Sequence, residues 1–522
     1  MDDLKLFAKN DEELTRLLGI VKEYSDTIQM NFNADKCAKL TIKKGKQIST
    51  QNIELDHETV IRELDNTTNY KYLGISESAG ISHKIMKVKI VKEYNKRVRL
   101  IKRFDPTITT KRKKNKILAI NSLAVPVIQY SFPIINWTIQ EIKKVDTKTR
   151  KLLTCNRAHH PKADIDRLYL KRSEGGRGLL QAEMSYKLNY IGHNKYLESS
   201  KDWMMKCVYN FESKKKLYSI KKKAEQFNIE LSIQEPKPGN GEGTRLAKKS
   251  KELAKIAALN QMQQQWEQKP LHGKFAKRTS EADVDRNKTF SWLKSSGLKA
   301  ETEGFIMAAQ DQSIKTKNYL TNIMKTSNDP KCRFCKEYVE TVDHLISGCP
   351  LLAKKDYITR HNNVAQYVHW KICQHYGFNV SDRWYEHLTP PVVENQSATI
   401  LWDYSIQTDR TIKANRPDIV IKDKTENKCL LLDVSIPSDR NTSPKIFEKL
   451  SKYKDLDIEL TKSWKMKTRT IPIVIGALGV VPKSTLKYIS EIPGKLAIEE
   501  IQKITLLGTL NILRKALSFI AV

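Results

Sequence analysis

The stretch RPDIVIKDKTENKCLLLDVSIPSD, residues 416–439, decides the fold of the C-terminal part of this chain. It holds two runs rich in aliphatic residues, DIVIK and CLLLDVSI, on either side of the polar run DKTEN. Two strand-forming runs that flank a short polar turn predict a β-hairpin. Asp418 begins the first run and Asp433 lies late in the second. Antiparallel pairing brings these two ends together, so the two carboxylates are expected to share a divalent cation.

A helix is expected directly after the hairpin, in SPKIFEKLSKYKDLDIEL, residues 443–460. Ser443 is a good N-cap residue, because its hydroxyl can accept a hydrogen bond from a free backbone N–H of the first turn. Pro444 suits the first helical position, since its φ angle is already helical and its missing N–H is not needed there. The hairpin and this helix predict a small α/β domain.

Four side chains of this helix extend the acidic pair. Glu448 and Lys452 are four residues apart and share a face, and Lys449 lies one turn before Tyr453. Metal-assisted hydrolysis of a phosphodiester needs carboxylates to hold Mg²⁺ and a cation or base to position the water. The two aspartates and one helix lysine supply that set. The plainer interpretation is two surface aspartates at strand ends, which are common in α/β domains.

A cluster of cysteines and histidine precedes this domain, in KCRFCKEYVETVDHLISGCP, residues 331–350. The spacing C-x2-C-x8-H-x4-C is formed by Cys332, Cys335, His344 and Cys349. Three soft thiolates and an imidazole at these short spacings suit tetrahedral Zn²⁺. Because four protein ligands leave no open position, the expected zinc ion is structural. The plainer interpretation is four unliganded residues with cysteine as a small core residue.

The charge of the chain favours a polyanionic partner. Lys plus Arg number 92 against 59 for Asp plus Glu in 522 residues, a net charge of +33. Such an excess points to nucleic acid as the partner.

The cysteines indicate the compartment. The five of the eight that lie outside the cluster are scattered, which suits a reducing compartment rather than a disulfide framework. The sequence shows neither a signal peptide nor an apolar stretch of transmembrane length, so we expect a soluble nuclear or cytosolic protein.

The N-terminal half mixes short elements with one strongly basic segment. Residues 11–26 carry Leu14, Leu17, Leu18 and Val21 at helical spacing, and residues 38–46 are typical of a strand that runs into a turn. Residues 83–118 hold fourteen Lys or Arg and two acidic residues. Their apolar residues recur at steps of three and four, which predicts an amphipathic helix with a cationic outer face for a polyanion: Val91, Tyr94, Val98 and Ile101.

The middle of the chain is expected to be helical up to the cysteine cluster. The glycines of RLYLKRSEGGRGLL, residues 167–180, predict a tight turn between helical stretches: Gly175, Gly176 and Gly178. Residues 235–244 have the composition of a linker, and residues 245–268 predict a long helix. From about residue 355 the order is helix, strands, helix and strand.

These stretches together resemble the C-terminal half of a non-LTR (LINE-type) retrotransposon polyprotein, of the clade with a restriction-enzyme-like endonuclease. MDDLKLFAKN, residues 1–10, looks like the reverse-transcriptase motif whose two aspartates bind catalytic metal, here Asp2 and Asp3. NADKCAKLTIKKGK resembles the following motif, with Lys36 at the lysine thought to protonate pyrophosphate. YKYLGI, residues 70–75, is similar to the primer-grip region, and RLYLKRSEGGRGL to the thumb and linker signature.

The cysteine cluster matches the zinc knuckle of this family, and YITRHNNVAQYVHW with the hairpin resembles its PD-(D/E)xK-type endonuclease. The resemblance implies that Asp418 and Asp433 are metal ligands. The lysine of the usual nuclease pattern would fall at Ser435, whereas this family supplies it from the next helix. That leaves two alternatives: spacing to Tyr453 favours Lys449, and the face shared with Glu448 favours Lys452. Three further residues are expected to contact DNA: Arg360, His361 and Arg416. His369 is expected to be a packing residue.

The resemblance also implies a domain order. It predicts an α+β multidomain fold with a partial palm at 1–75, a helical thumb and basic region at 76–190, a helical linker at 191–330, the CCHC zinc knuckle at 331–352, the endonuclease at 355–482 and C-terminal helices at 483–522. A third catalytic aspartate and the fingers, which a polymerase needs, have no match. We therefore expect this chain to lack polymerase activity, and the reading frame to be a fragment.

The expected function is that of a retrotransposon endonuclease fragment. It would bind element RNA and target DNA in the nucleus, after import from the cytoplasm, and nick DNA to prime reverse transcription, with structural Zn²⁺ and catalytic Mg²⁺ as cofactors and no membrane partner. One alternative is a non-enzymatic, zinc-containing nucleic-acid-binding relic. Another is an incomplete gene model.

Overall fold

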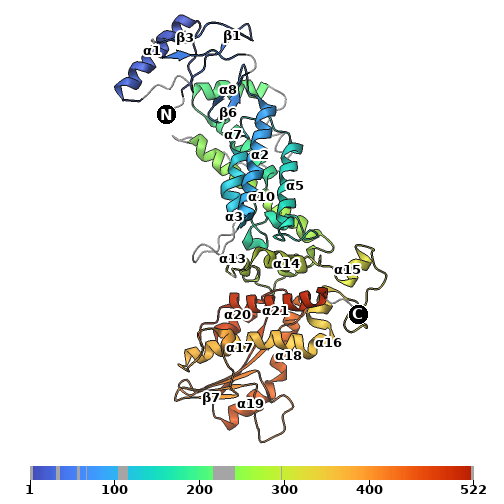
Figure 1. The fold of residues 1–522 in the computed structure, drawn as a ribbon. Helices are drawn as coiled ribbons and strands as arrows, with labels where there is room; N and C mark the ends of the chain where they lie inside the picture. The colour runs from blue at the N-terminus through green and yellow to red at the C-terminus, as the bar shows by residue number, and fades with distance from the viewer. Residues whose placement is uncertain are drawn as a thin grey trace.

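The computed structural model of the chain describes residues 4–30, 36–55, 59–65, 68–103, 116–214, 242–295 and 297–518. The fold is mixed α+β, as predicted, and its largest sheet among these residues has five strands. Figure 1 shows an elongated molecule with the N-terminal part at one end, long helices in the middle and the five-stranded sheet at the other end. No helix in the described ranges has the length and hydropathy to cross a bilayer.

The N-terminal part consists of one helix and short hairpins. Helix α1 (Asp11–Thr27) confirms the predicted amphipathic helix, and its Leu18 packs against Ile53 and Ile61. The predicted strand and turn are also present, as the first of three antiparallel ribbons: β1 (Thr41–Lys43) with β2 (Lys46–Ile48), β3 (Ile53–Glu54) with β4 (Val60–Ile61), and β5 (Tyr70–Tyr72) with β6 (Ile75–Glu77).

Helices fill the middle of the molecule. The predicted basic helix is α2 (His83–Arg103), whose Tyr94, Val98 and Ile101 are buried, while Lys84, Lys89, Lys92 and Lys96 are exposed; residues 104–115 lie outside the described ranges. The other helices are α3 (Lys116–Ala119), α4 (Val125–Gln129), α5 (Ile139–Cys155), α6 (Asp166–Tyr169), α7 (Ala182–Ser199), α8 (Trp203–Lys214), α10 (Glu242–Gln268), α11 (Gly273–Thr279), α12 (Arg286–Thr289), α13 (Trp292–Ser295), α14 (Ala300–Gln310) and α15 (Lys317–Asn322). Helix α10 confirms the predicted long helix, and residues 235–241 of the predicted linker are not described.

The predicted glycine turn joins α6 to α7 through the short 3₁₀ helix Arg172–Glu174. Gly175 has φ +87°, a left-handed conformation that side chains with a Cβ rarely adopt. The carbonyl of Gly175 accepts a hydrogen bond from Arg167, whose guanidinium also pairs with Asp311 at 2.9 Å, and both partners are fully buried. This ion pair ties the turn to the end of α14.

The five-stranded sheet has the order β11-β10-β9-β8-β7. Its strands are β7 (Val392–Glu394), β8 (Ala398–Trp402), β9 (Ile419–Asp423), β10 (Lys428–Ser435) and β11 (Lys467–Val474). All neighbours are antiparallel except β10 and β11, which are parallel and are connected through α18 (Thr442–Lys452) and α19 (Lys454–Ser463). The predicted order of helix, strands, helix and strand is confirmed, beginning with α17 (Ile358–His375).

Helices cover both faces of this sheet. On one face, α17, α20 (Lys483–Ser490) and α21 (Ile498–Ser518) pack on alternate strand residues such as Ile421 and Leu432. On the other face, α19 packs on the intervening residues, such as Leu431. The α21 helix lies between the sheet and the middle helices, close to α13 and α14 (Figure 1). Its residues therefore belong to two hydrophobic cores.

Candidate active site and metal centre

The predicted hairpin is present as β9 and β10. The register pairs Ile419 with Leu432, so Asp418 and Asp433 stand opposite each other as the next pair along the two chains. Asp418 Oδ2 accepts a hydrogen bond from Val434 N at 2.7 Å, which holds that carboxylate against the end of β10. The two aspartates come together because the four-residue turn between the strands fixes their register.

The Asp433 carboxylate is buried, with 2% of the residue exposed. The Tyr453 hydroxyl donates to its Oδ1 at 2.8 Å. Burial of the phenol and the charge of Asp433 raise the pKa of Tyr453, so the hydroxyl stays protonated as a donor. Lys449 Nζ lies 2.6 Å from Oδ2 as an ion pair, yet this oxygen has no hydrogen bond of good geometry. Oδ2 is therefore a buried carboxylate oxygen whose charge is balanced by the Lys449 ammonium beside it.

The four side chains predicted to extend the acidic pair do not all reach it: Glu448, Lys449 and Lys452 of α18, and Tyr453 at its C-cap. Lys449 points to the hairpin, as described, with 14% of its side chain exposed. Lys452 donates instead to the Tyr453 hydroxyl at 2.8 Å. Glu448 is exposed and pairs with Lys445 at 2.6 Å. The structure thus brings Lys449 and Tyr453 to Asp433, and leaves Glu448 on the outer surface.

The predicted start of this helix is wrong by two residues. Helix α18 begins at Thr442 after a 3₁₀ turn, with Asn441 rather than Ser443 at the N-cap. The Ser443 hydroxyl donates to Asp283, which comes from a loop between α11 and α12. A tertiary hydrogen bond has taken the place of the expected cap, so Pro444 lies inside the first turn rather than at its first position.

His361 of α17 completes the polar group around Asp418. Its Nε2 lies 3.0 Å from both Asp418 Oδ2 and the Val434 carbonyl, and its Nδ1 lies 3.0 Å from Asn362 Oδ1. All of these partners are acceptors, so both ring nitrogens donate and the ring is an imidazolium. Burial acts to lower the pKa of His361, but the hydrogen bond and charge of Asp418 outweigh it and raise that pKa to about 9.

The two predicted DNA-contacting arginines occupy different places. Arg360 is buried, donates to Thr509 Oγ1 at 2.9 Å and to the Ile436 carbonyl at 3.2 Å, and lies over the Tyr357 ring. Arg416 is exposed and donates to the Asp403 carboxylate at 2.7 Å. As placed, Arg360 joins α17 to α21, and the predicted contacts of these arginines with DNA stay predictions.

A cavity of about 480 Å³ opens beside these groups. Its wall includes Asp418, His361 and Lys449, together with Arg360 and Ser435. Residues that the sequence did not single out also line it: Ser347, Trp402 and Asp403. They come from the π-helix His344–Gly348 and the end of β8, so no local motif could have linked them to the hairpin.

The fit to Mg²⁺ rests on the two carboxylates that the hairpin places opposite each other. Carboxylate oxygens are the ligands that Mg²⁺ prefers, and the two aspartates would hold it. However, among the described residues Asp418, Asp433 and His361 do not form a set whose ligand atoms all lie within 4.8 Å of one another. Binding of Mg²⁺ here therefore stays a prediction.

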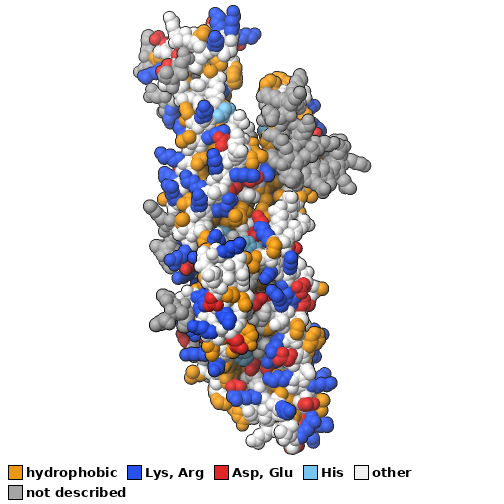
Figure 2. All heavy atoms as spheres, turned by 90° about the vertical axis from the view of Figure 1, so that its right-hand side faces the viewer, with side chains coloured by type: hydrophobic (Ala, Val, Ile, Leu, Met, Phe, Trp, Pro, Cys, Tyr) orange, Lys and Arg blue, Asp and Glu red, His pale blue; other side chains and the backbone are white. Residues whose placement is uncertain are grey.

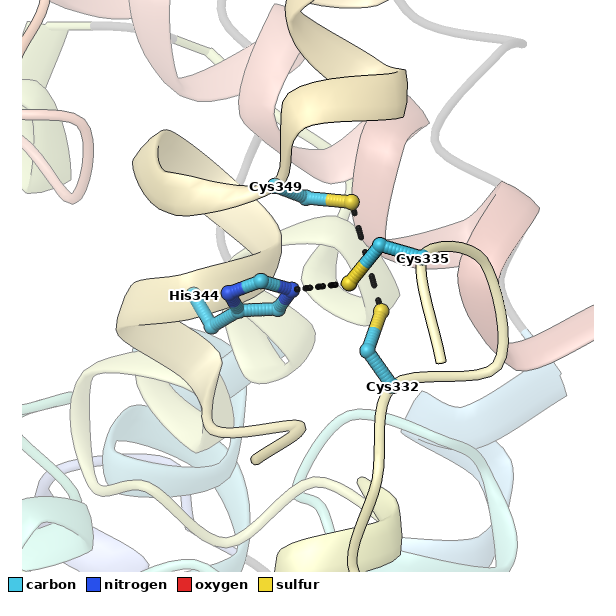
Figure 3. A group of neighbouring side chains, drawn as sticks. All are labelled: Cys332, Cys335, His344 and Cys349. Carbon is cyan, nitrogen blue, oxygen red and sulfur yellow. Dashed lines mark hydrogen bonds between the residues drawn. The ribbon is translucent and has the colours of Figure 1, made fainter. Parts of the chain in front are cut away.

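The four predicted zinc ligands do converge. Cys332 and Cys335 lie on one turn, His344 begins the π-helix His344–Gly348 and Cys349 follows its end, and their side chains point toward one another (Figure 3). The ligand atoms all lie within 4.8 Å of one another; Cys335 Sγ is 3.4 Å from His344 Nε2, and Cys332 Sγ is 4.0 Å from Cys349 Sγ. Ligands of a tetrahedral zinc ion are separated by about 3.3–3.8 Å. The cluster is geometrically compatible with a zinc site, as predicted.

Neighbouring groups fix the ligand loop in the fold. The Tyr357 hydroxyl accepts from Cys349 N at 3.0 Å and donates to the Leu345 carbonyl at 3.0 Å. Arg333 donates to Glu340 and, at 2.6 Å, to the Ala516 carbonyl of α21. Burial raises the pKa of Cys332 to about 12, so its thiol would stay protonated unless a metal ion bound there.

Of the three residues predicted from the polymerase motifs, the structure describes only Lys36. Asp2 and Asp3 lie outside the described residues. Lys36 is exposed, and its carbonyl accepts a hydrogen bond from the Tyr70 hydroxyl at 2.7 Å. The predicted role of Lys36 in polymerisation stays a prediction.

Comparison with known proteins adds no assignment. Neither a family model nor a curated protein matches the chain.

Proposed function

We propose that this chain binds nucleic acid and nicks DNA in a metal-dependent reaction at the cavity beside Asp418 and Asp433. The observation that supports the proposal most strongly is the convergence of Asp418, the Lys449 ammonium and the His361 imidazolium at one cavity, with the buried Asp433 carboxylate paired to Lys449. This set of carboxylates and cations fits phosphodiester hydrolysis, because the carboxylates can hold a metal ion and the cations can balance the negative charge of the substrate and its transition state.

In this proposal, Asp418 and Asp433 would hold Mg²⁺, which when bound lowers the pKa of a water molecule and neutralises phosphate charge. The Tyr453 hydroxyl orients Asp433 by its hydrogen bond to Oδ1. Lys449, which lines the cavity, contacts the phosphate or the attacking water. His361 keeps Asp418 in place through the hydrogen bond to Oδ2 and adds positive charge at the cavity wall.

The charge of the chain supports the nucleic-acid part of the proposal. Figure 2 shows Lys and Arg side chains spread over the length of one face, with Asp and Glu interspersed among them. A net charge of +33 supplies long-range attraction to a phosphate backbone, independent of base sequence. Such binding would serve the proposed partners, the RNA of a retroelement and its nuclear target DNA.

A nicking assay on supercoiled plasmid tests the proposal. The full chain with Mg²⁺ is expected to yield open circles, and EDTA or the double substitution Asp418→Ala, Asp433→Ala is expected to abolish them. Glu426→Gln is the matched control, since this acidic residue lies in the turn of the same hairpin and is exposed. Equal nicking by the double variant would refute the assignment of the site.

A second candidate function is a zinc-containing nucleic-acid-binding protein without catalysis. Its support is the pairing of Asp433 with Lys449, which satisfies the charge of the carboxylate without a metal ion. Titration with Mg²⁺ distinguishes the two, because the binding protein would bind DNA with no nicking at any Mg²⁺ concentration.

A further inference from the structure

A second group of histidine and cysteine side chains lies inside the sheet domain. His369 and Cys373 are four residues apart on α17, and His387 follows the 3₁₀ helix Trp384–Glu386 in the segment before β7. All three are buried, with 0%, 1% and 6% of the residue exposed. They are separate from the four-residue zinc cluster and from the aspartate hairpin.

The ligand atoms of this group already surround a common point. Nδ1 of His369 lies 2.8 Å from Nε2 of His387, and Sγ of Cys373 lies 3.6 Å from the same Nδ1. One ligand atom from each residue lies within 4.8 Å of the others. Since ligands of a tetrahedral zinc ion are about 3.3–3.8 Å apart, a shift of the two rings by about half an ångström would admit the ion.

The hydrogen bond between the two imidazoles requires one of the two facing nitrogens to be unprotonated, and an unprotonated ring nitrogen is the form that binds a metal ion. Nitrogen and thiolate donors select Zn²⁺ over Mg²⁺ or Ca²⁺. The helical spacing of His369 and Cys373 lets one turn of α17 supply two ligands, and Gln366, which donates to the His387 carbonyl at 2.6 Å, fixes the third on the same helix.

We propose that His369, Cys373 and His387 bind a second zinc ion. Zinc binding would replace the hydrogen bond between the two imidazoles and deprotonate the Cys373 thiol, whose proton passes to solvent. The ion would tie the segment between α17 and β7 to the C-terminal half of α17. This proposal does not depend on the nuclease proposal.

The position of the site suggests what the ion would stabilise. His369 meets the Trp402 ring edge to face at 5.4 Å between ring centres, and Trp402 lines the cavity. His361, Ala365, His369 and Cys373 follow one another at steps of four along α17, which places them on one side of the helix. A zinc ion here would therefore fix the helix that carries His361 and the wall that Trp402 forms.

Metal content of the purified full chain tests the proposal. We expect two zinc ions per wild-type chain, and one in each of the variants Cys373→Ser and His387→Asn. The matched control is Cys429→Ser, because Cys429 is a fully buried cysteine of the same domain that lies outside the cluster, and it should retain two. One zinc ion per wild-type chain, or two in both ligand variants, would overturn the proposal and leave a plain hydrogen-bonded histidine pair.

A cobalt titration covers the case in which the ligand variants do not fold. Wild-type chain freed of zinc should take up two equivalents of Co²⁺, one with the charge-transfer band expected for three thiolates and one with the band for a single thiolate. His387→Cys should still bind two, with a stronger band because a second thiolate has been added. Uptake of one equivalent by wild type would again contradict the proposal.

Discussion

Lys449 and Lys452 lie three residues apart on α18, but only Lys449 contacts a carboxylate of the hairpin. We expect Lys449→Met to lower the nicking rate by about 100-fold or more, because a cation next to the reacting phosphate would be lost. Lys452→Met should lower it by less than about 10-fold, since this ammonium donates only to the Tyr453 hydroxyl. Single-turnover nicking of a plasmid measures both. The reverse order would assign the catalytic role to Lys452.

His159, in the loop between α5 and α6, predicts an acid sensitivity of the helical part. Burial, with the charge of nearby Arg177, lowers its pKa from 6.5 to about 4. Between these values the unfolded chain binds more protons than the folded chain, so stability falls as pH falls. From pH 7 to pH 5 this group should cost about 2 kcal/mol of unfolding free energy.

The variant His159→Gln isolates that effect. It has no group that titrates in this range, so its unfolding free energy should fall by about 2 kcal/mol less than that of wild type between pH 7 and pH 5. Denaturant unfolding at the two pH values, followed by circular dichroism, measures the difference. Parallel losses in the two proteins would show that His159 is accessible to protons in the folded state.

At the scale of elements, the contact between α17 and α21 depends on a glycine. A Cβ on Gly508 of α21 would lie 2.6 Å from Arg360 Cγ. We expect Gly508→Ala to lower the unfolding free energy by about 1–3 kcal/mol, because the buried Arg360 stem must move. Gly19→Ala is the control: nothing lies within 4 Å of that position on α1, and alanine should stabilise the helix by about 0.5–1 kcal/mol. Changes of the same sign would contradict the predicted packing.

The elements that the sequence predicted correctly depend on local interactions. The hairpin follows from two apolar runs and the turn residues between them, and α10 follows from a long helical pattern. The predicted start of α18 was wrong, because the Ser443 hydroxyl donates to Asp283, which lies 160 positions earlier in the chain, and does not cap the helix. The contact of His361 with Asp418 spans 57 positions, and no spacing rule indicates it. The convergence of Cys332, Cys335, His344 and Cys349 was predictable, since all four lie within one short segment.

At the scale of the whole molecule, the exposed lysines of α2 predict how binding depends on salt. Lys92 and Lys96 are one turn apart on the outer face. If both contact phosphates, Lys92→Gln with Lys96→Gln should reduce the slope of log Kd against log salt by about 2. Lys424→Gln with Lys428→Gln removes the same charge from residues that already pair with Glu394 and Glu426, and should change it by less than about 0.5. Equal changes would show that α2 has no special role.

The arrangement of the whole chain was the least predictable part. C-terminal helices were expected at 483–522 as a unit of their own, whereas α21 packs on α17 on one side and on α13, α14 and the π-helix His344–Gly348 on the other. The apolar residues of α21 lie on two of its sides. This pattern fits a helix buried within one core or a helix shared by two cores, and only the tertiary structure distinguishes these two cases.

The most direct test of the nuclease proposal is the single-turnover nicking rate of Asp433→Asn at saturating protein and Mg²⁺. This change removes the charge of the buried carboxylate and keeps its shape. We predict a loss of at least about 100-fold relative to wild type, with DNA affinity and melting temperature nearly unchanged, and no loss for Glu426→Gln. Nicking by Asp433→Asn at the wild-type rate would contradict the account.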